Sequence, residues 1–143
     1  MAANSAYSVN VRLCRNFQFI GMDHAGHSVV MDASKPEGEG SGASPMNMLL
    51  FALGGCTGMD IVQGLKKTGQ KLTGLEVGVT GERNDRSPRY YTKIHIHYKV
   101  SGDIKEDLLA KTIQDSQEIF CSVAATLNGK AVISTSYELD KVQ

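Results

Sequence analysis

The chain has 143 residues, a length typical of one domain, and its 15 basic and 15 acidic side chains cancel. Neither a basic stripe nor an acidic tail is present, which argues against a nucleic-acid partner. No apolar run approaches the roughly 20 residues of a membrane span, and the first residues lack the basic and apolar regions of a secretory signal. We therefore expect one cytoplasmic domain, 1–143, with neither a nucleic-acid nor a membrane partner.

The first part of the chain alternates apolar and polar residues, which is the period-two pattern of half-buried strands. Strands are expected at 7–13 and 17–19, and a third at 27–31 returns after the turn 23–26. The segment 34–42 is rich in Pro, Gly and Ser, and this composition predicts a mobile loop and not a domain boundary.

A long helix is predicted to begin at Ser44-Pro45, because Ser caps helices and Pro fits the first turn. It continues to Leu65, and Gly69 is a suitable stop. Its first half is apolar on nearly all sides, so this helix must be covered all round. Either the other elements of the same chain supply that cover, or a second subunit does. We favour the second arrangement, an intimate homodimer.

Further strands are predicted in the second half of the chain. The segments 75–79 and 92–100 alternate in the same way, and the charged turn 82–89 joins them. The last strand carries its apolar residues on one face between Ala131 and Leu139. Strands joined as hairpins indicate a largely antiparallel sheet.

Two helices are predicted between these strands. Asp103 is expected to cap the first, with Glu106 completing an acidic variant of the capping box, and the apolar stripe of this helix reaches Phe120. A short helical stretch then runs from Ser122 to Asn128. The predicted order is therefore β-β-β-α-β-β-α-α-β, and the fold class is α+β.

The cysteines Cys14, Cys56 and Cys121 are odd in number, which argues against a structural disulfide framework. Cys56 lies well inside the long helix, where burial would raise the pKa of its thiol and the helix dipole gives little help. Cys121 precedes a short helix, whose free N–H groups would lower the pKa of its thiol. Cys14 is interpreted as structural. Spacing alone does not place Cys56 and Cys121 together.

Two segments resemble the cysteine motifs of a known family. The stretch 42–56, GASPMNMLLFALGGC, resembles the first cysteine motif of the OsmC/Ohr family, the osmotically inducible and organic hydroperoxide resistance proteins. The stretch 118–123, EIFCSV, is similar to the second motif. The resemblance covers essentially the whole chain and looks closest to the YhfA-like branch. It implies antiparallel sheets packed around a long central helix, in an intertwined homodimer with active sites at the subunit interface.

The same resemblance implies a mechanism for Cys56 and Cys121. Cys56 would attack the O–O bond of a hydroperoxide as thiolate and become a sulfenic acid, and Cys121 would condense with it to a disulfide. An external thiol or lipoyl reductant would reopen that disulfide, and neither a metal nor an organic cofactor is implied. The apolar residues before Cys56 favour organic hydroperoxides as substrates, in oxidative-stress defence.

The chain departs from the family at the residues that activate the thiolate. Well-characterised peroxidases of the family use an Arg that is held by a Glu shortly after the helix-opening Pro. Here Met46 and Asn47 follow Pro45, and neither is acidic. The activating arginine is left open among Arg12, Arg15, Arg83 and Arg89. The departure keeps two other functions open: a redox-sensing or apolar-ligand-binding protein on the same fold, and a structural dimer in which the cysteines only pack.

His95 and His97 lie on one face of an expected strand, at a spacing compatible with metal binding. Lys93 and Lys99 share that face, so we interpret it as a solvated polar surface. No metal site is predicted.

Overall fold

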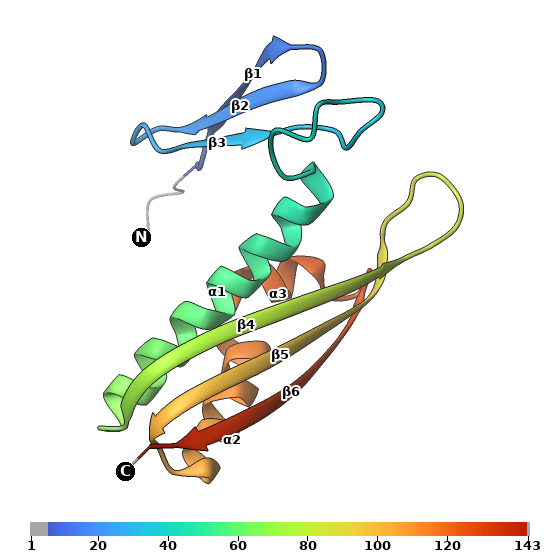
Figure 1. Cartoon of the computed structure of the whole chain (residues 1–143). Helices are drawn as coiled ribbons and strands as arrows, with labels where there is room; N and C mark the ends of the chain where they lie inside the picture. The colour runs from blue at the N-terminus through green and yellow to red at the C-terminus, as the bar shows by residue number, and fades with distance from the viewer. Residues whose placement is uncertain (1–5, 143) are drawn as a thin grey trace. The chain divides into compact units, whose positions relative to one another are not determined.

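The computed structural model describes residues 6–142 as an α+β structure with two three-stranded sheets (Figure 1). The chain forms two compact units, the first ending at Leu49 and the second beginning at Leu50. The predicted order of strands and helices is confirmed, with one π-helical turn added, and the single domain expected for 1–143 stays a prediction. The elements are β1 (Val9–Arg15), β2 (Gln18–Asp23), β3 (Ser28–Met31), α1 (Pro45–Lys67), β4 (Lys71–Arg83), β5 (Tyr91–Asp103), α2 (Glu106–Asp115), the π-turn η1 (Ser116–Phe120), α3 (Ser122–Leu127) and β6 (Val132–Lys141).

The first unit contains the antiparallel sheet β1-β2-β3. Val11 is paired with Gly21 across β1 and β2, and Gly21 with Val29 across β2 and β3. Paired residues of neighbouring strands point to the same face of a sheet, so this face is apolar. It is also open to solvent; its exposed members are Val9, Val11, Leu13, Phe19 and Val29.

The loop predicted at 34–42 is present and is tied back to the end of β3. The buried carboxylate of Asp32 accepts hydrogen bonds from the Ser41 backbone N–H at 3.0 Å and from the Ser41 hydroxyl at 2.6 Å. The Ala33 backbone N–H donates to the same side chain at 2.8 Å. These hydrogen bonds, those from Ser41 first, lower the pKa of Asp32. The loop is therefore a folded feature, and the prediction that it is mobile finds no support in this arrangement.

The second unit contains the sheet β4-β5-β6, and this sheet is mixed. β4 and β5 form the expected antiparallel hairpin. The expectation of antiparallel pairing is wrong for β6, which runs parallel to β5 from the pair Lys93–Val132 to the pair Gly102–Lys141. The reason is the connection: α2, η1 and α3 form a crossover between β5 and β6, and a parallel pair requires such a crossover.

Helix α1 lies close to β4 and to α2, as Figure 1 shows. A Cβ atom at Gly54 would lie 3.1 Å from a methyl of Val79 in β4, and one at Gly64 would lie 2.6 Å from a methyl of Thr112 in α2. Both glycines therefore permit a close approach that a larger residue would oppose. The core of the unit consists of Leu53, Ile61, Leu65, Ile94, Ile96, Tyr98, Val100, Leu109 and Ile113.

The prediction that Asp103 caps the second helix is wrong. Asp103 is the last residue of β5, where it pairs with Lys71 of β4. The N-cap of α2 is Lys105, which has no side-chain cap, and its backbone N–H donates to Gln70 Oε1 at 2.8 Å. The sheet pairing extends β5 beyond the capping-box signal, and the amide of Gln70 supplies an acceptor in its place.

Part of the surface of α1 is exposed in the single chain. Phe51 is 62% exposed and Met59 is 74% exposed, so the cover predicted on all sides is not supplied by the described residues 6–142. By length and composition this helix could also cross a membrane, since an 18-residue stretch of it has mean hydropathy 1.4. That corrects the expectation that no segment matches a membrane span. It is weak evidence for one, because the core helix of a soluble protein passes the same test.

Candidate functional site

The two predicted site cysteines meet in the second unit, together with a carboxylate that the sequence reasoning missed. The sulfur atoms of Cys56 and Cys121 and a carboxylate oxygen of Asp60 all lie within 4.8 Å of one another. Cys56 is half-buried and Cys121 is buried. Two sulfur atoms at this separation need only a small movement to reach the roughly 2.05 Å of a disulfide bond.

Helix geometry explains why Asp60 accompanies Cys56. The two residues are four positions apart in α1, so their side chains lie on the same face, one turn from each other. A polar residue four positions after a cysteine in an otherwise apolar helix is the signal that could have identified Asp60 from the sequence. Thr57, a polar residue directly after Cys56 in the same apolar helix, is a second signal of this kind.

Cys121 is positioned by the π-turn that ends at Phe120. Its backbone N–H donates to the Ser116 carbonyl at 2.7 Å, closing that turn. Its own backbone is extended, with φ −73° and ψ 100°, and α3 begins at the next residue. π-helical turns are rare and occur often at functional sites, where they redirect the chain within a helix. Here the turn occupies the last residues of the first predicted helix and precedes the short second one.

The prediction that Cys121 lies at the start of a short helix is confirmed, but the prediction that this position lowers the pKa of its thiol is wrong. The thiol does cap α3, since the Ala124 backbone N–H donates to Cys121 Sγ at 3.4 Å. Burial nevertheless raises the pKa of Cys121 to about 11, and the neighbouring Cys56 and Asp60 add to the rise. Because Cys121 is only 3% exposed, the loss of hydration outweighs one hydrogen bond from a helix end. At neutral pH this residue is a thiol and not a thiolate.

A buried hydroxyl network extends from Asp60 into the core. Ser116 Oγ donates to Asp60 Oδ2 at 2.9 Å and lies 2.8 Å from Thr57 Oγ1, which in turn lies 2.6 Å from the Tyr98 hydroxyl. The Gln117 amide donates to Thr57 at 3.1 Å and to Tyr98 at 3.2 Å. Burial raises the pKa of Tyr98. The network joins α1, β5 and η1 beneath the thiol pair.

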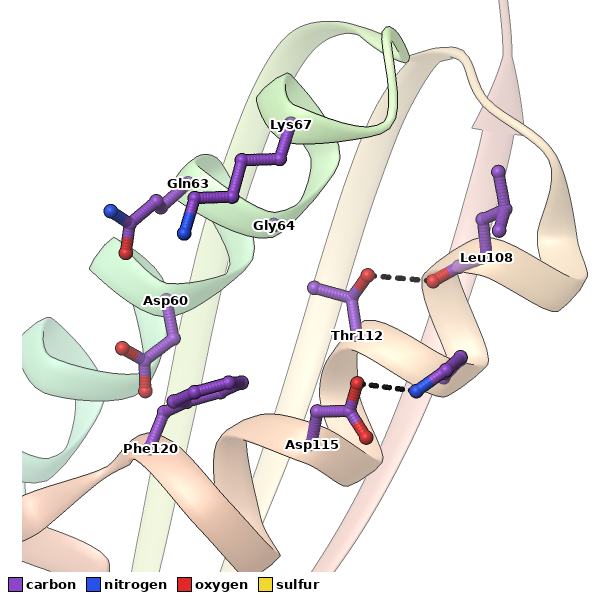
Figure 2. A pocket seen from close by; sticks show the side chains of 9 residues that line it. Asp60, Gln63, Gly64, Lys67, Leu108, Thr112, Asp115 and Phe120 are labelled. Atoms are coloured by element: carbon purple, nitrogen blue, oxygen red, sulfur yellow. Dashed lines mark hydrogen bonds and ion pairs between the residues drawn. The ribbon is translucent and has the colours of Figure 1, made fainter.

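A cavity of about 200 Å³ lies between α1 and α2 and shares Asp60 with the thiol group. Figure 2 shows Asp60, Gln63 and Lys67 on α1, and Asp115 on α2, with the Phe120 ring between the two helices. The Lys111 ammonium is paired with the Asp115 carboxylate at 2.6 Å. Lys67 makes no ion pair with any other residue that the structure describes. The cavity therefore has one positive charge without an ion-pair partner among the described residues.

Most of the arginine candidates are already engaged within their own units. Arg15 forms an ion pair with Glu39 at 2.8 Å. Arg83 donates twice to the Arg89 carbonyl, at 2.8 and 2.6 Å, within the turn between β4 and β5, and Arg89 Nε donates to the Asn84 carbonyl at 3.1 Å. The guanidinium of Arg12 makes no hydrogen bond or ion pair with any described residue, which distinguishes it from the other three.

Cys14 and the histidine pair lie apart from any comparable cluster. Cys14 is exposed on β1, so it is not the buried packing residue that was expected. His95 contacts the hydroxyls of Ser134 and Ser136, and His97 contacts Ser136, all at 2.7 Å. These polar contacts on an exposed strand face agree with a solvated surface.

Among residues 6–142, the Cys56–Asp60–Cys121 group is the one place where three His, Cys, Asp or Glu side chains bring their polar atoms this close. Structural zinc sites take four such side chains. The three found here, with their two sulfur atoms adjacent, have the composition of a redox-active thiol pair with a carboxylate beside it.

Comparison with known proteins agrees with this description. The family described as OsmC-like protein matches residues 38–136, which include Cys56, Asp60 and Cys121. Protein YhfA of Escherichia coli K12 is 36% identical over 130 residues, covering 90% of this chain and 95% of that protein.

Solved structures share the fold over nearly the whole chain. A hypothetical protein from Aquifex aeolicus is 25% identical with a TM-score of 0.87, covering 97% of this chain and 99% of that one. The organic hydroperoxide resistance protein OhrB of Bacillus subtilis is 15% identical with a TM-score of 0.64, covering 95% of this chain and 100% of that one. At that identity the second likeness concerns the fold alone. On the profile match and the YhfA identity together, this chain belongs to the OsmC-like family.

Proposed function

We propose that this protein is a thiol-dependent peroxidase that reduces organic hydroperoxides with Cys56 as the attacking residue and Cys121 as the resolving residue. The observation that supports this most directly is the approach of the two sulfur atoms to within 4.8 Å. The family includes hydroperoxide resistance proteins, which agrees with a peroxide as substrate. A cytoplasmic location in oxidative-stress defence stays part of the proposal.

The proposed reaction has three steps. The Cys56 thiolate attacks the terminal peroxide oxygen, the O–O bond breaks, and the alcohol leaves with a proton while Cys56 becomes a sulfenic acid. Cys121 attacks the Cys56 sulfur, so the S–S bond forms and the S–O bond breaks with loss of water. An external dithiol, such as a lipoyl group, then reduces the disulfide by two thiol–disulfide exchanges.

The proposal includes a homodimer. Its support is the apolar surface that the single chain leaves open on the first sheet and on α1, where Phe51, Met59 and Val62 are exposed. Contiguous exposed apolar patches are uncommon on monomeric proteins and mark interaction sites.

The test is turnover of tert-butyl hydroperoxide with dihydrolipoamide as reductant. We expect Cys56→Ser to abolish turnover, and Cys121→Ser to form sulfenic acid without a disulfide. Cys14→Ser is the matched control, since Cys14 is the exposed third thiol, and it should leave turnover unchanged. Undiminished turnover by Cys56→Ser would contradict the proposal. Arg12→Ala is the first arginine variant to compare, with Arg83→Ala as its control.

A redox sensor is the second candidate, and one observation favours it: the charged side chain beside the thiols is a carboxylate and not the cation that activates a reactive cysteine. A sensor would form the Cys56–Cys121 disulfide once, on exposure to peroxide, and would not be reduced rapidly enough by dihydrolipoamide to turn over. The same assay therefore separates the two functions.

A further inference from the structure

We propose that Asp60 is the proton-transfer residue of the thiol pair, taking the proton of Cys121 as that thiol attacks Cys56 and passing it to the departing group. The inference deepens the proposed function. Its chemistry is thiol–disulfide exchange, which can be tested without a peroxide.

The carboxylate of Asp60 lies near both sulfur atoms and is hydrogen-bonded to the buried Ser116. One carboxylate oxygen lies within 4.8 Å of both Cys56 Sγ and Cys121 Sγ. A base at this separation reaches a thiol proton through one water molecule. The half-buried side chain is also held in place, because the buried Ser116 hydroxyl donates to it at 2.9 Å.

Cys121 needs a base because of where it lies. It is buried, and burial raises the pKa of its thiol to about 11, so the protonated form dominates at neutral pH. The thiolate is the attacking species in disulfide formation, so an unassisted Cys121 would react slowly. Burial also keeps bases in the solvent away from this thiol. Asp60 is the carboxylate that the fold places beside it.

The hydroxyl network has a fixed direction that ends at Asp60. An ionised carboxylate can only accept, so Ser116 donates its single proton to Asp60 and must accept from Thr57. Thr57 has then used its own proton, so the Tyr98 hydroxyl donates to it. The Gln117 amide donates to both. Aligned hydrogen bonds strengthen one another, so the network holds the Asp60 carboxylate in one orientation.

The charges around Asp60 agree with that assignment. On its own helix, Lys67 and the Gln63 amide line the same cavity. On α2, the Lys111 ammonium is neutralised by Asp115. On β5, Tyr98 stays neutral because burial raises its pKa. Lys67 is thus the cation of this cavity that has no ion-pair partner among the described residues.

Cys121–SH and Cys56–S–OH give Cys56–S–S–Cys121 and water. The S–S bond forms with the electron pair released from the Cys121 S–H bond, and the proton moves to Asp60. The Cys56 S–O bond breaks, its electron pair leaves with oxygen, and the proton passes from Asp60 to that oxygen. Asp60 ends as it began, as a carboxylate.

The test uses the full chain with Cys14→Ser, which removes the exposed third thiol. Cys56 is first converted to a methyl disulfide with methyl methanethiosulfonate. Attack by Cys121 then releases methanethiol, and acid quenching with mass spectrometry follows the loss of the methylthio group over time. We expect Asp60→Asn to slow this release about 100-fold at neutral pH, as general-base catalysis contributes 10²–10⁴ in rate. The Asp60→Asn rate should then rise about tenfold per pH unit toward the Cys121 pKa.

The opposite outcome overturns the inference. If Asp60 acts only through its charge, Asp60→Asn removes a negative neighbour, lowers the pKa of Cys121 and accelerates the release. Asp60→Glu keeps a carboxylate and should restore part of the rate. Ser116→Ala keeps Asp60 itself but removes its anchor, and we expect about a tenfold loss. Ser116→Ala decides the question if Asp60→Asn does not fold, since an unchanged release rate in that variant would refute the role of the anchored carboxylate.

The methanethiol release assay tests the role of Asp60 independently of peroxidase activity. A protein that shows Asp60-dependent release but does not reduce tert-butyl hydroperoxide would keep this inference and lose that function. If the Asp60→Asn protein reduces the peroxide and releases methanethiol at unchanged rates, the peroxidase proposal is kept and the role of Asp60 is refuted.

Discussion

Strand β1 of the first sheet leaves Val9, Val11 and Leu13 at least 50% exposed, whereas β5 of the second sheet buries Ile94 and Ile96 almost completely. Both strands have the same alternating pattern, so the difference lies in what covers each sheet. The second sheet has α1 and α2 of its own unit, with the core residues between them. Among the described residues of the first unit, 6–49, the first sheet has no helix beyond the start of α1. The second unit therefore has a core of its own, and we propose that a second copy of the chain covers the first sheet.

The largest effect is expected from a charge on the apolar face of the first sheet, which tests whether that face is covered by a second copy. We expect Val11→Asp to dissociate the dimer and to raise its dissociation constant by about a thousandfold or more, because an unpaired carboxylate in an apolar interface costs several kcal/mol. Asn10→Asp adds the same charge to the opposite face of β1 and is the matched control. Sedimentation velocity measures the dimer.

Hydrogen exchange tests the second half of the same contrast. In the Val11→Asp protein, amides of the first sheet should lose protection, while those of β5 keep it. Loss of protection in both units together would contradict the idea that the second unit has a self-sufficient core. A dimer that survives Val11→Asp unchanged would show that this face is not the interface.

A smaller effect is expected from the polar centre of the second unit. Thr57→Val keeps the shape of the side chain but removes the hydroxyl to which Tyr98, Ser116 and Gln117 are hydrogen-bonded. Buried polar groups left unpaired cost about 1–3 kcal/mol, so we expect the free energy of unfolding to fall by about 2 kcal/mol. Urea unfolding followed by circular dichroism measures this as a lower midpoint at unchanged slope.

Thr73→Val is the control for that substitution. Thr73 is also in the second unit, but it is exposed and its hydroxyl only contacts Ser101 at 3.3 Å. Its replacement should change the free energy of unfolding by less than about 0.5 kcal/mol. Equal effects of the two substitutions would mean that the buried network does not stabilise the core.

The parts of this fold that the sequence predicted are those with a local signal. Alternation located the strands, and Ser44 with Pro45 located the start of α1, where Ser44 Oγ does accept from the Asn47 backbone N–H at 3.2 Å. The direction of β6 has no local signal, since it depends on how the crossover from β5 packs. Asp103 gave a misleading signal, because strand pairing with Lys71 competes with the cap.

The candidate site divides in the same way. The motifs around Cys56 and Cys121 were visible in the sequence, but their approach in space depends on the π-turn that ends at Phe120. The pKa of Cys121 was misjudged because helix capping is local and burial is not. Asp60 was overlooked because a single acidic residue in a long helix usually faces solvent.

The smallest effect we predict concerns pH and isolates the buried thiol. Burial raises the pKa of Cys121 in the folded protein from the ordinary value of 9.0 to about 11. A group whose pKa is higher when folded holds its proton more tightly in that state, so its contribution to stability is complete below pH 9 and is lost as pH rises toward 11. Other groups titrate in the same range, and the useful quantity is therefore the difference between variants. We expect the stability of the Cys121→Ser protein to fall less steeply between pH 9 and 11 than that of the unmodified chain. Cys14→Ser, which replaces the exposed thiol of the first unit, should leave the slope unchanged. Identical slopes in all three proteins would mean that Cys121 is hydrated in solution, and the second unit would then be more open around its thiol pair than the contrast between the two sheets implies.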